Sequence, residues 1–124
     1  MGESDDRLAD MFRRQEEFMQ LLKDNDRIPE WPLDLTTKQG QRLIKETLFN
    51  MGEELHEASH TLKNRMHRLT DARVYDREHY VEELGDAWAY FMEVLILSGV
   101  TPEEFHREYV RKNAVVIDRL QKGY

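Results

Sequence analysis

Cysteine is absent from the 124 residues of this chain, so no disulfide framework stabilises the fold. A chain without cysteine fits a reducing compartment, and we therefore expect a cytoplasmic protein. The sequence also lacks an apolar run long enough to span a bilayer and shows no signal-peptide pattern. We accordingly expect no membrane as a partner.

Clustered positive charge is lacking as well. The chain has 25 acidic residues against 18 lysines and arginines, which gives a net charge of −7. A surface that binds a nucleic acid polymer needs clustered lysine and arginine to neutralise phosphates, so we expect no such partner. The charge does not exclude a single nucleotide, which arrives with its own metal ion.

No segment shows the period-two alternation of a β-strand, and no repeat or low-complexity run is present. Apolar residues instead recur at helical spacing in four segments. We predict helices from about residue 7 to Leu22, from Thr36 or Thr37 to Lys63, from the N-cap Asp76 to Ser98, and from the cap Thr101 to Gly123. The residues between the first two segments, with Pro29 and Pro32 around Trp31, are expected to form a loop. We predict one all-α domain, residues 1–124, folded as a four-helix bundle.

Two pairs of acidic residues are the most informative feature of the sequence. Glu54 and Glu57 lie on the second predicted helix, and Glu83 and Asp86 lie on the third. At about 100° per residue, each pair flanks the apolar stripe of its own helix by a similar angle and in the same rotational sense. Antiparallel packing of these helices would place both pairs on the same side of the seam and at a similar height. The sequence therefore predicts that the four carboxylates converge.

Four converging carboxylates repel one another and resist desolvation, so they require a cation. All-oxygen ligands favour Mg²⁺, with Mn²⁺ as a substitute, over zinc. The simpler interpretation is a solvated face, because 35% of the residues are charged and acidic neighbours such as Glu103 and Glu104 arise by chance. Two pairs with matched angle and matched height are harder to explain in that way.

The segment His56-Glu57-Ala58-Ser59-His60 matches the H-E-x-x-H signature of zinc metalloproteases. Both histidines lie roughly 140° from the apolar stripe, in the most polar sector of the predicted helix. No pattern for a third ligand follows them. We interpret this overlap with the acidic motif as accidental and keep a zinc hydrolase as the least favoured alternative.

The fourth predicted helix carries polar residues that fit a phosphate-containing ligand. Asn113 lies within its apolar stripe, and a buried amide without a partner costs about 1–3 kcal/mol, so it either bonds the backbone or faces a polar site. Lys112 and Arg119 flank the stripe on one side and could neutralise phosphate oxygens. Alone, they would be ordinary surface cations.

Taken together, these motifs resemble a known superfamily. Glu53-Glu54-x-x-Glu57 followed by Glu83-x-x-Asp86 is similar to the EExxE…ExxD signature of the all-α nucleoside triphosphate pyrophosphohydrolases, the MazG-like and dimeric dUTPase group. The resemblance extends from about Lys38 to Tyr124, and its last part is Lys112-Asn113…Arg119…Gly123-Tyr124.

The resemblance implies a role for each matching residue. It makes Glu54, Glu57, Glu83 and Asp86 the metal ligands, with Glu53, Lys112 and Arg119 as catalytic residues and Asn113, Gln15, Trp31 and Asn50 as substrate-binding residues. Gln15 and Trp31 are assigned by similarity to the dimeric dUTPase branch, where such residues approach the base. Chains of this size also resemble phage enzymes that act on purine deoxynucleotides, which would place this protein in the host cytoplasm.

The expected reaction is Mg²⁺-dependent hydrolysis of a nucleoside triphosphate, by preference a deoxynucleotide, to the monophosphate and pyrophosphate. The resemblance also implies a fold completed by oligomerisation, as a homodimer or tetramer. The competing interpretation is a non-enzymatic helical interaction module whose acidic residues only solvate its surface. A metal-dependent change in melting temperature distinguishes the two.

Overall fold

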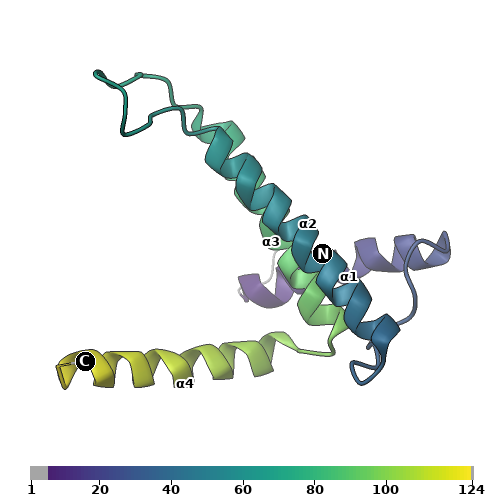
Figure 1. Cartoon of the computed structure of the whole chain (residues 1–124). Helices are drawn as coiled ribbons and strands as arrows, with labels where there is room; N and C mark the ends of the chain where they lie inside the picture. Colours follow the sequence, from purple (N-terminus) through teal and green to yellow (C-terminus); the bar gives the residue numbers. More distant parts are fainter. Residues whose placement is uncertain (1–5, 124) are drawn as a thin grey trace. The chain divides into compact units, whose positions relative to one another are not determined.

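The computed structural model describes residues 6–123, and within this range the chain is all-helical with four helices and no strand. The helices are α1 (Arg7–Asp24), α2 (Lys38–His60), α3 (Arg77–Leu97) and α4 (Pro102–Gln121) (Figure 1). The predicted helical class and the existence of all four helices are confirmed. Tyr124, the end of the motif resemblance, lies outside the described residues.

Local hydrogen bonds explain where the helices begin. The side chains of Asp6, Thr37, Asp76 and Thr101 each accept a hydrogen bond from the backbone N–H three residues later, at 3.0 to 3.1 Å. This is the N-cap geometry, which satisfies one of the backbone donors left free in the first turn. The predicted caps Asp76 and Thr101 are therefore confirmed. At the start of α2, Gly40 is required because a Cβ there would collide with the backbone carbonyl of Asp34.

The end of α3 is a Schellman motif. Gly99 has a φ of +75°, a conformation that L side chains rarely adopt. Its N–H donates to the carbonyl of Ile96 at 3.0 Å, and the N–H of Val100 donates to that of Leu95 at 2.8 Å. The prediction that Gly99 stops the third helix is confirmed.

The chain divides into two compact units, and the boundary falls inside α3. One unit contains residues 33–94, which include α2 and most of α3; the other contains residues 1–32 and 95–124. A single domain over residues 1–124 stays a prediction. In the second of these units α1 contacts α4, and the most buried side chains are Phe12, Met19 and Leu97.

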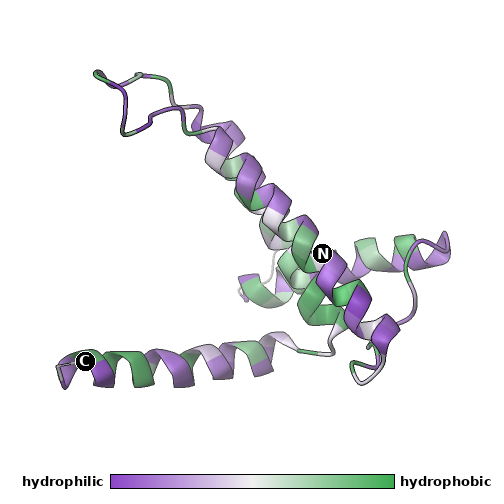
Figure 2. Ribbon diagram, in the orientation of Figure 1, coloured by the Kyte–Doolittle hydropathy of each residue, from purple (hydrophilic) through white to green (hydrophobic). Residues whose placement is uncertain are grey.

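In the unit of residues 33–94, α2 and α3 form a hairpin joined by the segment 61–76 (Figure 1). The Asn64 side chain closes this segment, because its amide both donates to the carbonyl of Ala72 and accepts from the N–H of the same residue, at 3.1 and 2.6 Å. Apolar residues concentrate in the later part of α3 (Figure 2), where Met92 and Val94 are buried.

The apolar stripe predicted for α2 is only partly buried; its members are Ile44, Leu48, Met51, Leu55, Ala58 and Leu62. On α2, Ala58 is buried, but Leu48 and Leu55 are 43% and 45% exposed. Thr47, which the stripe did not include, is buried and donates its hydroxyl to the carbonyl of Leu43 at 2.8 Å. A single copy of the chain thus leaves much of the apolar surface of α2 in contact with solvent.

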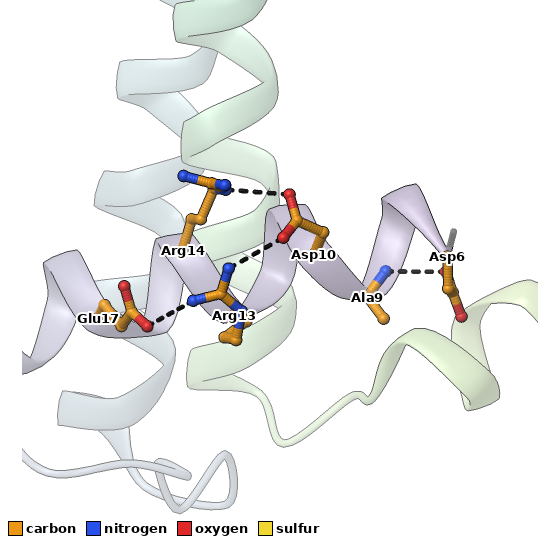
Figure 3. A network of polar contacts seen from close by, with 6 residues as sticks. All are labelled: Asp6, Ala9, Asp10, Arg13, Arg14 and Glu17. Carbon is orange, nitrogen blue, oxygen red and sulfur yellow. Dashed lines mark hydrogen bonds and ion pairs between the residues drawn. The ribbon is translucent and has the colours of Figure 1, made fainter. Parts of the chain in front are cut away.

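The polar surface of α1 is a network of ion pairs (Figure 3). Asp10 accepts from Arg13 and from Arg14, both at 2.9 Å, and Arg13 also donates to Glu17 at 2.7 Å. The two guanidinium groups lower the pKa of Asp10, mainly through the hydrogen bond from Arg14. None of the helices in residues 6–123 is long and apolar enough to cross a membrane.

Candidate metal centre

Three of the four predicted carboxylates meet between α2 and α3. Glu54, Glu57 and Glu83 each offer a carboxylate oxygen, and these oxygens all lie within 4.8 Å of one another. Glu54 and Glu57 are one helical turn apart on α2, whereas Glu83 comes from α3. Carboxylates from two helices come this close when they lie at a similar angle from the apolar stripe of their helix and at a similar height along it. This is the arrangement that the sequence predicted for an antiparallel pair.

The fourth carboxylate, Asp86, is not within this ligand distance but acts on the cluster electrostatically. The pKa of Glu54 is raised, first by desolvation and then by a hydrogen bond shared with Glu83 when a proton lies between them. The negative charges of Asp86, Glu83 and Glu57 raise it further, in that order. Among residues 6–123, the charged side chains that act on the pKa of Glu54 are therefore all negative.

The carboxylate of Glu83 is largely enclosed and contacts a histidine. Its side chain is only 12% exposed, and its Oε1 lies 3.1 Å from Nε2 of His79. While Glu54 is ionised, the other oxygen, Oε2, is buried and accepts no hydrogen bond from any residue in the range 6–123. A buried carboxylate oxygen without a donor is costly, because it has lost its hydration without replacement.

This arrangement fits a hard divalent cation. The available donors are carboxylate oxygens, which Mg²⁺ and Mn²⁺ prefer, and no thiol or imidazole belongs to the cluster of ligand oxygens. A cation at Glu54, Glu57 and Glu83 would offset their mutual repulsion and give Glu83 Oε2 the partner that it lacks within the described residues. These carboxylates therefore fit the Mg²⁺ ion that the acidic signature implies.

Two further residues of α3, Tyr90 and Glu93, have shifted pKa values and were not identified from the sequence. The pKa of Tyr90 is raised, first by burial and then by the charges of Glu54, Glu93 and Asp86. The pKa of Glu93 is raised by burial. Tyr90 and Glu93 follow Asp86 at i+4 and i+7, so continuing the i, i+3/i+4 pattern of the acidic face along the helix would have found them.

The histidines of the H-E-x-x-H segment do not join the cluster. His56 and His60 are exposed, and their rings pack edge to face with centroids 5.1 Å apart. They line a surface pocket of about 440 Å³ together with Glu53 and Glu57. Within residues 6–123, no group of three potential ligands includes a histidine. This geometry does not favour a zinc site.

The other predicted residues of this unit lie on the exposed surface of α2. Glu53 borders the pocket of His56 and His60. Asn50 is exposed, one helical turn before Glu54, and lines a neighbouring pocket of about 670 Å³ together with Lys38 and Lys45. The catalytic role of Glu53 and the substrate-binding role of Asn50 stay predictions.

The remaining predicted residues belong to the other compact unit. Gln15 and Trp31 are half-buried, on α1 and in the loop that follows it. Lys112, Asn113 and Arg119 lie on α4 and are exposed. Lys112 lies near Glu108, whose pKa is lowered first by Arg111 and to a smaller extent by Lys112. The assignment of these five residues to a substrate stays a prediction.

A comparison of the chain with protein-family models, curated proteins and solved structures finds no match in any of the three.

Proposed function

We propose that this protein is a Mg²⁺-dependent nucleoside triphosphate pyrophosphohydrolase, which converts a nucleoside triphosphate and water into the monophosphate and pyrophosphate. The observation that carries the proposal is the convergence of Glu54, Glu57 and Glu83 within 4.8 Å across two helices. These are residues of the acidic signature that resembles the MazG-like and dimeric dUTPase group. Because a chance pair on a solvated face does not require convergence, this geometry supports the proposal over the simpler interpretation.

The carboxylates of α2 and α3 hold the metal in this proposal. Glu54, Glu57 and Glu83 are the ligands at short range, and Asp86 contributes negative charge from one turn further along α3. When bound, the metal supplies charge neutralisation for the triphosphate and an activated water. Glu53, the carboxylate beside the cluster, accepts the proton of the attacking water.

The motif resemblance also gives residues of α4 a role in this proposal. Lys112 and Arg119 neutralise charge on the departing pyrophosphate, and Asn113 binds a phosphate or the sugar. These side chains are exposed and therefore available to a ligand. Gln15, Trp31 and Asn50 are proposed to contact the nucleoside.

Oligomerisation is part of the proposal. α4 has no buried residue, and its Tyr109, Ile117 and Leu120 are 64%, 47% and 70% exposed. Leu48 and Leu55 of α2 are exposed as well, and groups of exposed apolar side chains are typical of surfaces that bind another protein. A homodimer or tetramer would bury these side chains.

The direct test is a screen of the ribonucleoside and deoxynucleoside triphosphates with Mg²⁺, in which pyrophosphate and inorganic phosphate are measured separately. The screen includes dUTP and the purine deoxynucleotides, because the two branches of the resemblance differ in the base. We expect pyrophosphate as the first product, with the monophosphate in equal amount. Inorganic phosphate appearing first together with the nucleoside diphosphate would show that the reaction is assigned wrongly.

A second candidate is a helical interaction module without catalytic activity. The exposed apolar side chains of α2 and α4 favour it, because they are equally suited to a different protein partner. Thermal melts with EDTA and with Mg²⁺ separate the two functions. An enzyme whose carboxylates hold a cation is stabilised by Mg²⁺, whereas a module with a merely solvated acidic face is not.

A further inference from the structure

We infer that His79 is a positioning residue for the carboxylate of Glu83, an inference that rests on the proposed function. His79 is not part of the acidic signature and lies one turn before Glu83 on α3. Its Nε2 is 3.1 Å from Oε1 of Glu83, and since an ionised carboxylate can only accept, the imidazole N–H donates. The contact occupies one of the two oxygens of Glu83.

The start of α3 fixes where His79 stands. The backbone N–H of His79 donates to the side chain of Asp76 at 3.1 Å, and the N–H of Tyr80 donates to the carbonyl of Asp76 at 3.0 Å. His79 is thus held in the capped first turn of the helix. The cap fixes the backbone of His79, and its side chain then lies one helical turn from Glu83, where side chains at i and i+4 meet.

The consequence is a division of roles between the two oxygens of Glu83. Oε1 is held by His79, while Oε2 is buried and has no hydrogen-bond partner in the described part of the chain. Fixing one oxygen restricts rotation of the carboxylate and leaves the other for a cation. Groups that bind a metal ligand from outside the coordination sphere typically change metal affinity or activity by about 10–100-fold when they are removed.

Other groups around His79 do not supply the same hydrogen bond. His79 also lines a pocket of about 490 Å³, whose other polar side chains include Glu57, His60, Lys63 and Asp76. Lys63 donates its ammonium group to the carbonyl of His60 at 2.8 Å. In the part of the chain that the structure describes, the side chain that donates a hydrogen bond to Glu83 is therefore that of His79.

The test measures metal binding directly and does not require turnover. Melting temperatures are recorded across a series of Mg²⁺ or Mn²⁺ concentrations for wild type, His79→Ala, His79→Gln and the matched control His106→Ala, an exposed histidine of α4. We expect His79→Ala to raise the metal concentration at half-maximal stabilisation by about 10–100-fold. His79→Gln, whose amide can donate from a similar position, should recover most of the affinity, and His106→Ala should match wild type.

His79→Asn, whose amide is too short to reach Glu83, serves as a second disrupting variant if His79→Ala does not fold. An unchanged or lower half-maximal concentration in either disrupting variant would overturn the positioning role, and so would a glutamine variant as weak as alanine. A wild-type protein that shows neither metal-dependent stabilisation nor hydrolysis would instead overturn the proposed function and this inference with it. The two failures are therefore distinguishable.

Discussion

Acidic residues occupy two different electrostatic environments in this molecule. On α1, Asp10 accepts hydrogen bonds from two arginines, and its pKa is lowered. Between α2 and α3, Glu54 lies among Glu57, Glu83 and Asp86, and its pKa is raised. The first group carries its own counter-charges, whereas no lysine or arginine pairs with the second among residues 6–123. The two groups of acids should therefore respond differently to an added divalent cation.

The largest effect should come from removing a carboxylate of the cluster. Glu54→Gln keeps the shape of the side chain but removes a proposed ligand. We therefore expect hydrolysis to fall at least about 100-fold, more than is typical when a residue that only hydrogen-bonds to a metal ligand is removed. The measurement is pyrophosphate release at saturating Mg²⁺. If Glu54→Gln retains wild-type turnover, the clustered acids are no more functional than those of α1.

The proposed function also predicts a role for Lys112 of α4. Lys112→Ala should lower turnover by about 10–100-fold if its ammonium group stabilises the leaving pyrophosphate. The matched control is Lys23→Ala, because Lys23 lies on α1 and pairs with Glu30 at 3.2 Å. Equal turnover in the two variants would remove Lys112 from the mechanism.

Stability gives a second contrast between the two environments. Asp86→Asn relieves repulsion on Glu54, so in EDTA the variant should melt about 2–5 °C above wild type. The same change should reduce the additional stabilisation by Mg²⁺. Melting curves with EDTA and with Mg²⁺ measure both effects. Equal stabilisation of both proteins by Mg²⁺ would show that Asp86 does not belong to the site.

The pH dependence of stability follows from the direction of the Glu54 shift. Because its pKa in the folded protein is raised above the ordinary value of 4.5, the folded state binds a proton more tightly than the unfolded state. The stability contributed by this proton is fully present below the unfolded pKa and is lost as pH rises through the folded pKa.

Glu54→Gln removes this titration. In EDTA, the melting temperature of the variant should therefore exceed that of wild type most at pH 7, and the difference should shrink as pH falls toward 4.5. Thermal melts of both proteins across this range provide the measurement. A difference that stays constant, or that grows as pH falls, would contradict the raised pKa.

The smallest effect is expected on α1. Asp10→Asn weakens two exposed ion pairs, and exposed pairs contribute little to stability, so the melting temperature should fall by about 2 °C or less. The decrease should be the same with EDTA and with Mg²⁺. If the decrease in melting temperature of Asp10→Asn differs between EDTA and Mg²⁺, the acids of α1 also respond to the metal, and the proposed difference between the two groups is wrong.

Much of the local structure could be predicted because the signals are local. Asp76, Thr101 and Gly99 mark helix ends through hydrogen bonds within one or two turns, and the structure forms these bonds. The convergence of Glu54 and Glu57 with Glu83 was also predictable, since it follows from the angle and height of each residue on its helix. Both arguments need only the regular geometry of a helix.

The four helices, and the acidic residues that two of them bring together, could be predicted because helical periodicity and capping depend on near neighbours. Which of these groups are desolvated follows instead from the packing of the folded chain. It exposes Leu48 and Leu55 but buries Thr47, and it leaves one oxygen of Glu83 without a described partner while the other meets His79. Burial depends on what packs from elsewhere in the chain, and the pKa of a carboxylate depends on that burial and on charges from other helices. Such contacts are not encoded in the spacing of residues along one helix.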